Sequence, residues 1–264
     1  MKKGITIVLI VVCVVVFGYS AYQLLSYYSA NSAAERDFAQ LLPPDLASAD
    51  AGAEDGDSAA YLALLPYYDG LRAQNSDMVG WLRIPGSRIS YPVMQTINSP
   101  EYYLDKDFKK NYQVNGSLFA SNISDVNLPS DIVIIYGHRM KSGAMFGRLG
   151  DFLNQDYLSK NDTVVFDTFT ARNVYKIYCL FSLSVDPSVN VFDYYDYNQF
   201  GDEQAFNDFM AQVQGLANIV NPSNAPKFGD KILLLSTCEY THADGRLVMV
   251  AVRTNEIKRP VAVQ

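Results

Sequence analysis

The sequence is poor in the residues that build disulfide scaffolds and metal centres. Its 264 residues include 3 cysteines and 2 histidines, and no C-x-x-C pair occurs. A structural zinc site takes four Cys or His ligands at short spacings, and calcium requires clustered carboxylate and carbonyl oxygens. Neither pattern is present, so we expect no metal and no other cofactor.

Positive charge is also scarce. The chain carries 21 Lys and Arg against 28 Asp and Glu, a net charge of −7. Proteins that bind nucleic acids use clustered basic residues to displace counterions from phosphates. The sequence has no basic stripe, no glycine loop of the Walker type and no solenoid repeat. We therefore expect no nucleic-acid partner.

One long apolar run stands at the N-terminus. Residues 5–25 are uncharged and follow Lys2 and Lys3. A bilayer core of ~30 Å needs roughly 20 apolar residues as a helix, whereas a signal-peptide core has about 7–15. We predict that residues 1–34 form a cytoplasmic tip and a single transmembrane helix, with the remainder of the chain outside the cell. The alternative is a cleaved signal peptide, since small residues near position 30 offer a cleavage site.

The composition changes between the apolar run and the rest of the chain. Residues 43–60 are small and acidic, which is typical of a flexible tether, so residues 35–60 are predicted to be a linker. Residues 61–75 predict a short helix interrupted by proline and glycine. The folded domain is expected to occupy residues 61–264.

The pattern after this helix predicts a mostly β fold. Eight short apolar segments with turn residues between them favour a barrel or a sandwich. They are residues 80–84, 89–94, 116–120, 131–136, 163–167, 173–183, 231–237 and 246–253. A helix is predicted at about 203–216, where Phe206, Phe209, Met210 and Val213 recur at helical spacing.

The last two predicted strands form a hairpin, and two side chains with reactive or charged groups lie at its closed end. Cys238 ends one strand and Arg246 begins the next, so antiparallel pairing makes them neighbours. Arg253 lies seven residues further on, roughly 23 Å along an extended strand. A guanidinium beside a thiolate can stabilise the oxyanion formed when the sulfur attacks an amide. Cys238 and Arg246 are therefore the candidate nucleophile and oxyanion stabiliser.

A thiol catalyst also needs a group that gives a proton to the leaving amine, and histidine titrates in the right range. His138 follows a buried-looking strand, at a strand end where sites are commonly built. His242 lies in the polar hairpin loop near Cys238, so His138 is favoured on these grounds and His242 remains the alternative. The simpler readings are a structural histidine, a buried unreactive thiol, or a Cys179–Cys238 disulfide.

Three segments resemble the motifs of the sortases, the cell-wall transpeptidases of Gram-positive bacteria. They are residues 235–240 (LSTCEY), 134–140 (IIYGHRM) and 245–250 (GRLVMV), which are similar to the nucleophile, histidine and arginine motifs. Residues 75–95, the following 102–104 and the predicted helix before the Cys strand resemble class B of the family. The likeness covers essentially all of residues 61–264 and favours His138 over His242.

The resemblance implies an eight-stranded β-barrel with an N-terminal helix and a helix inserted before the Cys strand. It also implies cysteine-peptidase-type acyl transfer in two steps. Cys238 would attack the Thr carbonyl of a C-terminal sorting signal, His138 would act as acid and base, and Arg246 would hold the oxyanion. The expected partners are surface proteins that carry such a signal and an amine of lipid II or a peptidoglycan cross-bridge.

The family likeness also suggests residues that border the substrate. Residues 184–197 occupy the place of the family's specificity loop. The positions expected to contact substrate are Ser236, Thr237, Glu239, Asn115, Tyr194 and Tyr195. The segment after Cys238 differs from the commonest class B pattern in its length and in having His242.

Two other classes of protein remain as alternatives. A cell-wall cysteine peptidase would share the thiol and the imidazole, but commonly has its Cys before the His and at a helix N-terminus. A membrane-anchored β-domain that serves as an adhesin or scaffold would not need Cys238, His138 and Arg246 together.

Overall fold

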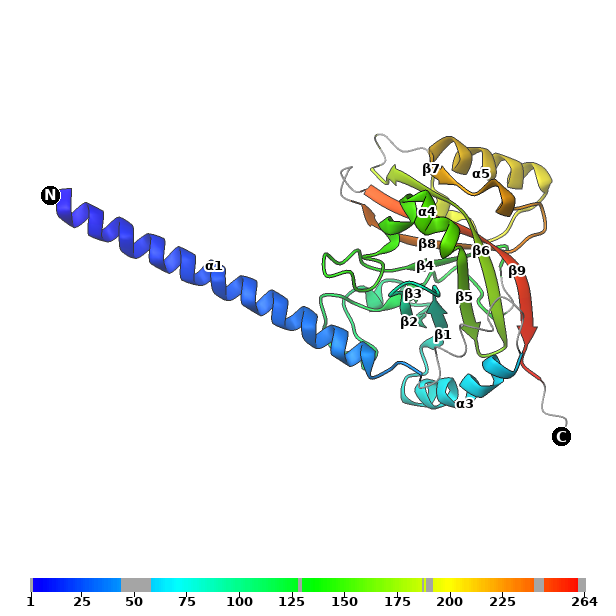
Figure 1. Cartoon of the computed structure of the whole chain (residues 1–264), viewed down its shortest axis with the longest axis horizontal. Coiled ribbons are helices and arrows are strands. Elements are labelled where there is room, and N and C mark those ends of the chain that lie inside the picture. Colours follow the sequence, from blue (N-terminus) through cyan, green and yellow to red (C-terminus); the bar gives the residue numbers. More distant parts are fainter. Residues whose placement is uncertain are drawn as a thin grey trace. The chain divides into compact units, whose positions relative to one another are not determined.

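A computed structural model describes residues 2–43, 58–127, 130–186, 188, 192–239 and 245–260 (Figure 1). The chain divides into two compact units, Met1–Gln40 and Leu41–Gln264.

The first unit is a single helix, α1 (Lys2–Ala39). Within the described part of the chain it is the one helix long and apolar enough to cross a membrane, over Gly4–Ser26. Large apolar side chains along this stretch are exposed, as a lipid-facing helix requires. The helix includes residues 35–39 of the predicted linker, and residues 44–57 of that linker lie outside the described residues. The predicted domain limits stay a prediction.

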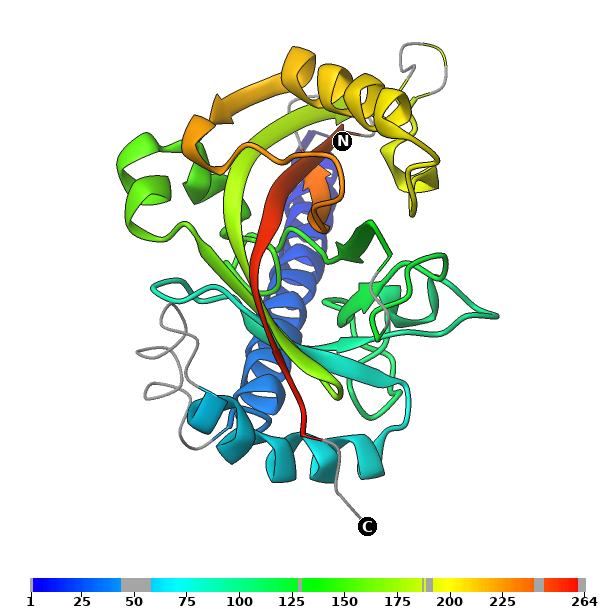
Figure 2. The same cartoon turned by 90° about the vertical axis from the view of Figure 1, so that its right-hand side faces the viewer.

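The second unit is built on a closed β-barrel. The barrel strands in the described residues are β1 (Met78–Arg83), β2 (Ser90–Met94), β3 (Leu118–Ala120), β4 (Ile132–Tyr136), β5 (Thr163–Thr168), β6 (Ala171–Ser184), β8 (Ile232–Glu239) and β9 (Gly245–Lys258). They pair in the order β5-β1-β2-β3-β4-β8-β9-β6, and β5 closes the ring by pairing with β6. The long β6 and β9 run side by side along the barrel (Figure 2). The predicted mostly β fold is confirmed, and the barrel replaces the sandwich alternative.

The strands β4 and β8 are continuous apolar runs because both of their faces are buried. They pair in parallel, from Ile132 opposite Ile232 to Tyr136 opposite Ser236. One face contributes to a core cluster with α5 (Glu203–Leu216). The alternate residues, among them Val133 and Leu233, are buried as well. Parallel strands covered on both sides show this unbroken apolar pattern.

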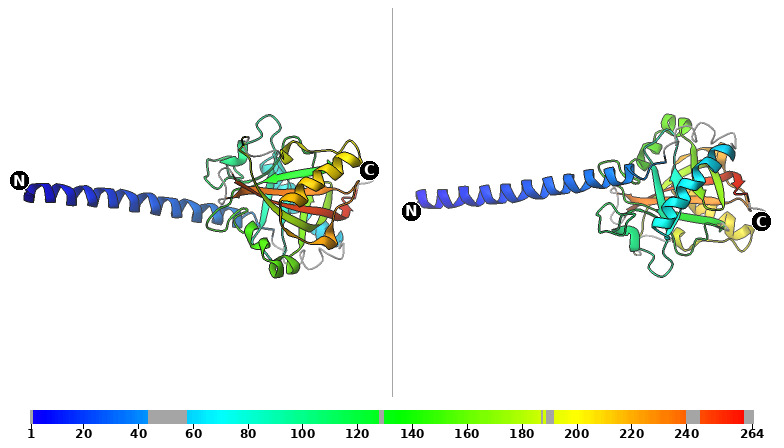
Figure 3. Two further views of the ribbon diagram at one scale, coloured as in Figure 1. Left: turned by 90° about the horizontal axis from the view of Figure 1, so that it is seen from above. Right: turned by 90° about the horizontal axis from the view of Figure 1, so that it is seen from below.

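Two helices lie on opposite sides of the barrel, α5 in front in the view from above and α3 in front in the view from below (Figure 3). α5 matches the predicted helix, and Asp202 caps it by accepting a hydrogen bond from the Ala205 amide at 2.9 Å. All four of its predicted core residues are buried. α3 (Ser58–Gln74) packs against β1 and runs unbroken through Pro66, so the predicted interruption is wrong. Proline removes one amide donor, and burial of the apolar face of α3 compensates for that loss.

Several short elements have no clear sequence signal. They are α4 (Gln155–Lys160), the strand β7 (Ala217–Val220) beside β6, and 3₁₀ turns at Tyr102–Leu104, Leu149–Leu153, Tyr194–Asp196 and Pro222–Asn224. β7 alternates half-buried and exposed residues over only 4 positions, too short for its period to be distinguished from loop.

A buried ionic cluster joins strands β1, β5 and β6 beneath α3. The Asp167 carboxylate accepts hydrogen bonds from Arg83 Nη1 at 2.7 Å and from Arg172 Nε at 2.8 Å. The Tyr68 hydroxyl of α3 donates to the same carboxylate at 3.2 Å. All three charged side chains are at most 1% exposed. Asp167 is therefore the carboxylate that two buried guanidinium groups share.

We expect Asp167→Asn to lower the free energy of unfolding by about 3–5 kcal/mol, because it removes the carboxylate charge that both buried guanidinium groups contact. The matched control is Asp69→Asn, which removes an ion pair with Arg259 whose side chains are 45% and 38% exposed. Such a surface pair contributes less than about 1 kcal/mol. Urea unfolding of the full chain in detergent measures both, and equal losses would contradict the role given to Asp167.

Candidate active site

The sheet register brings three of the predicted site residues to one end of the barrel. Cys238 is the register partner of Arg246 in the antiparallel pair β8–β9, as the hairpin predicted. On the other side of β8, the Gly137 amide donates to the Ser236 carbonyl at 3.1 Å and extends the parallel pairing beyond β4. His138 therefore stands level with the end of β8, and neighbouring strands lie about 4.8 Å apart. The side chain of Cys238 is outside the described atoms.

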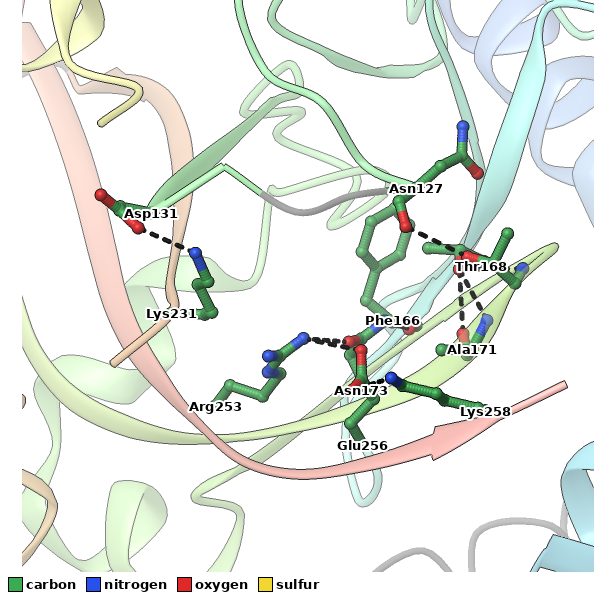
Figure 4. A network of polar contacts seen from close by, with 11 residues as sticks. Asn127, Asp131, Phe166, Thr168, Ala171, Asn173, Lys231, Arg253, Glu256 and Lys258 are labelled. Atoms are coloured by element: carbon green, nitrogen blue, oxygen red, sulfur yellow. Dashed lines mark hydrogen bonds and ion pairs between the residues drawn. The ribbon is translucent and has the colours of Figure 1, made fainter. Parts of the chain in front are cut away.

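The other arginine of β9 lies at the far end of the same ladder. Arg253 follows Val252, which pairs with Ile232 at the start of β8. Its guanidinium donates to Asn173 Oδ1 at 3.0 Å and to Glu256 Oε1 at 3.1 Å (Figure 4). Arg253 thus belongs to a structural network away from Cys238, whereas Arg246 is the arginine that pairs with Cys238.

The backbone around His138 is fixed from two sides. Gly137 has no space for a side chain, since a Cβ there would overlap Leu118 and Phe146. The His138 carbonyl accepts a hydrogen bond from the Phe146 amide at 3.0 Å. The imidazole is half-buried, and its Nε2 lies 2.8 Å from the Leu104 carbonyl oxygen. The position of the ring is therefore set by the fold before any ligand binds.

Arg246 is half-buried, and its Nη1 donates to the Gly245 carbonyl at 3.1 Å. Its charge acts on Tyr136, the last residue of β4. Burial raises the pKa of the Tyr136 hydroxyl well above its usual range, and the nearby Tyr194 adds to this while Arg246 opposes it. Tyr136 is accordingly a neutral phenol at working pH, and it does not cancel the charge of the Arg246 guanidinium.

Two of the expected substrate-contacting residues bond directly to each other. The hydroxyls of Ser236 and Tyr194 are 2.7 Å apart, and both side chains are buried. Tyr195 is half-buried and donates its hydroxyl to Asp193 at 2.8 Å. The side chain of Glu239 lies outside the described atoms.

The remaining two, Asn115 and Thr237, are buried polar residues with unsatisfied atoms. Asn115 is 1% exposed and Thr237 is 2% exposed. Neither the amide oxygen and nitrogen of Asn115 nor the hydroxyl of Thr237 has a hydrogen-bond partner among the described residues. Buried polar atoms are almost always paired, so these two positions are unusual.

The predicted specificity loop borders an acidic cavity. Of residues 184–197, positions 187 and 189–191 lie outside the described residues. The cavity has a volume of about 380 Å³ and is lined by Phe192, Asp193, Asp196, Tyr197, Asp208 and Gln212. Neither His138 nor Arg246 lines it. In the described part of the chain, no three His, Cys, Asp or Glu side chains gather as metal ligands.

Cys179 is a free thiol buried in β6, so the disulfide alternative does not apply to it. Burial raises the pKa of its thiol to about 12. A thiol of this kind is a packing group and not a nucleophile. His242 lies within residues 240–244, outside the described residues.

Sequence reasoning missed the Leu104 carbonyl. It belongs to the connection between β2 and β3, which approaches the site only in the folded chain. A backbone acceptor gives no signal in the sequence, because any residue type can supply it. One local indication is the glycine at position 116, which has a φ of +57° and where an added Cβ would overlap this carbonyl.

Comparison with known proteins identifies the same family that the sequence motifs resemble. A family model described as the Sortase domain matches residues 82–254. Sortase B of Staphylococcus aureus is 26% identical over 255 residues, covering 95% of this chain and 97% of the relative. Sortase B of Listeria monocytogenes is 31% identical over 182 residues, covering 68% and 70%.

Solved structures agree with the sequence matches. A Staphylococcus aureus sortase B–substrate complex superposes with a TM-score of 0.64 at 26% identity, covering 72% of this chain and 85% of that chain. A sortase B complexed with triglycine gives a TM-score of 0.64 at 26% identity, covering 74% and 87%. The chain therefore belongs to the sortase family of cysteine transpeptidases, and within it to class B.

Proposed function

We propose that this transpeptidase cleaves a C-terminal sorting signal after Thr and joins the new Thr carboxyl end to an amine of lipid II or a peptidoglycan cross-bridge. The observation that carries the proposal is the register of Cys238 with Arg246 and the position of His138 level with them. The related enzyme solved with its substrate and the one complexed with triglycine support a peptide donor and an amine acceptor.

In the first step the Cys238 thiolate attacks the Thr carbonyl carbon and forms a tetrahedral oxyanion. Arg246 donates hydrogen bonds to that oxyanion and keeps its own charge throughout. The C–N bond then breaks, and His138 gives its proton to the departing amine. The products are a thioester on Cys238 and the released C-terminal peptide.

In the second step an amine from the cell-wall precursor attacks the thioester carbonyl. His138, now neutral, takes the proton from the attacking nitrogen. The C–S bond breaks, the thiolate leaves, and a new amide bond joins the protein to the acceptor. His138 and Cys238 return to their starting protonation, so the cycle needs no cofactor.

We infer that Asn115 and Thr237 bind the peptide backbone of the sorting signal. An unpaired buried polar group costs about 1–3 kcal/mol, and a peptide amide or carbonyl bound there would remove that cost. Thr237 directly precedes Cys238, and Asn115 precedes Gly116, which adjoins the Leu104 carbonyl. Ser236, Glu239, Tyr194 and Tyr195 are proposed to border the same acyl site.

We also propose that α1 anchors the enzyme in the cell membrane as a single span, with the catalytic domain outside. The apolar stretch Gly4–Ser26 supports this, because its length fits a bilayer core of ~30 Å. The lysines before it favour a cytoplasmic N-terminus.

The full chain in detergent should convert a sorting peptide and triglycine into a Thr–glycine adduct, detected by mass spectrometry. Adduct formation with released C-terminal peptide is expected, because the thioester prefers an amine over water once the acceptor is bound. Hydrolysis without adduct at excess amine would instead indicate a cysteine peptidase. No turnover of any peptide in a library would favour the adhesin or scaffold alternative.

Substitution of the three candidate residues should separate their roles. Cys238→Ala is expected to abolish the thioester, and His138→Ala to lower the rate by about 10²–10⁴-fold through loss of the proton donor. The Arg246→Lys variant should also lose turnover, because the lysine ammonium is a point charge and cannot reproduce the fork of donors on the guanidinium. Arg253→Lys at the far end of β9 is the matched control and should stay active. Normal turnover in His138→Ala with loss in His242→Ala would reassign the acid/base to His242.

Alkylation should distinguish the two cysteines of the second unit. Because the pKa of Cys179 is raised to about 12, it has almost no thiolate from roughly pH 6 to pH 9 and should resist iodoacetamide in the folded protein. Cys238 should react, and activity should be lost in step with its modification, as followed by peptide mass spectrometry. The Cys179→Ala variant should show the same loss of activity. Modification of Cys179 before Cys238 is the contrary result.

A further inference from the structure

A backbone carbonyl can only accept a hydrogen bond, so a ring nitrogen bonded to it must carry hydrogen. Nε2 of His138 lies 2.8 Å from the Leu104 oxygen. We propose that the Leu104 carbonyl, whose position requires a glycine at residue 116, fixes the hydrogen on Nε2 of His138, so that Nδ1 is the nitrogen that exchanges the catalytic proton. This inference rests on the acid/base role proposed for His138, and it makes Gly116 a positioning residue.

The carbonyl is held by the connection in which it lies. Leu104 ends the 3₁₀ turn Tyr102–Leu104, where its amide donates to the Glu101 carbonyl at 2.9 Å. The preceding Tyr103 is fully buried, and its carbonyl accepts from the Ser117 amide at 3.0 Å. The turn is therefore tied directly to the start of β3, the strand that pairs with β4 before His138.

The side chain of Tyr103 fixes the other side of the turn. Its hydroxyl accepts from Asn75 Nδ2 at 2.8 Å and donates to Asp77 Oδ2 at 2.8 Å. Asn75 is itself buried and also donates to the Phe108 carbonyl at 2.7 Å. These bonds tie the turn to the segment between α3 and β1. A carbonyl held by two independent anchors has little freedom to follow a moving imidazole.

Gly116 allows the carbonyl to occupy this position. Its φ of +57° lies in the left-handed region, and an added Cβ would overlap the Leu104 oxygen and approach the Tyr103 oxygen to 2.7 Å. Both atoms are backbone, so neither can rotate away as a side chain could. Any residue larger than glycine must displace the turn that contacts His138.

The assignment determines the path of the proton. As an imidazolium, His138 donates from Nε2 to Leu104 and delivers the Nδ1 proton to the leaving amine. The ring is then the neutral Nε2–H tautomer, and the Nδ1 lone pair accepts the proton of the incoming amine. Leu104 stays bonded in both states, and its hydrogen bond is stronger to the charged ring, which favours proton capture. The imidazole ring therefore does not have to flip between the two steps.

Nitrogen NMR of the full chain in detergent, labelled with ¹⁵N-histidine, tests the tautomer directly. Comparison with His242→Gln identifies the His138 signals, and the pH is raised until that ring is neutral. We expect Nε2 to carry the hydrogen and Nδ1 to show the shift of an unprotonated nitrogen. A neutral ring protonated on Nδ1, or averaged between the two forms, would overturn the proposal.

Gly116→Ala tests the positioning role, with Gly229→Ala as its matched control. Gly229 has a comparable φ of +94°, but an added Cβ there meets nothing within 4 Å. Both substitutions carry the strain of a positive φ, and only the first disturbs the Leu104 carbonyl. We expect Gly116→Ala to lower kcat by about 10²-fold with little change in KM, and to weaken the Nε2–H preference. Gly229→Ala should match the wild type in kcat and in its preference for the Nε2–H form.

The two measurements separate this inference from the proposed function. Equal kcat values and equal tautomer populations in the two alanine variants would overturn the role of Gly116. If Gly116→Ala does not fold, the wild-type tautomer still decides the proposal. An active His138→Ala variant would refute the acid/base role, and with it the path of the proton, even where NMR shows the Nε2–H form.

Discussion

The parallel pairing of β4 with β8 is the constraint on which the site depends. Two parallel strands end on the same side of a sheet, so Tyr136 and Ser236 lie opposite each other although 100 residues separate them. The chain segments that continue from them, through Gly137 and into Cys238, then emerge together. The antiparallel return of β9 adds Arg246 at the same level. A one-residue slip of either pairing would break this alignment.

The barrel can hold that register because the strands are buried on both faces. The crossover between β4 and β8 contains β5, β6, β7 and α5, and α5 covers one face of the pair. On the opposite side of the barrel, α3 covers the buried charges of Arg83, Asp167 and Arg172 through Tyr68. Among the strands that the structure describes, closure leaves a free edge only at the short β7 beside β6. The site is therefore built on strands that cannot slide independently.

Much of the precision at the site comes from backbone atoms. The Leu104 carbonyl contacts His138, and the Gly137 amide bonds to Ser236. Such groups are placed by the fold, and substitution of their own side chains leaves them in position. Glycine matters where backbones approach closely, as at Gly116, because a Cβ there would meet carbonyl oxygens. The buried amide of Asn115, next to Gly116 in the chain, has no hydrogen-bond partner among the described residues.

The sequence alone determined the main elements and one contact of the candidate site: apolar runs indicated eight strands, helical spacing indicated α5, and the hairpin made Cys238 and Arg246 neighbours. These are local signals, read within a few residues. The tertiary structure decided what depends on distant segments meeting: barrel closure by β5 and β6, the level of His138, the isolation of Arg253, and the approach of Leu104 and Asn115. Composition cannot encode these contacts, because strand order and register are set by packing of the whole barrel.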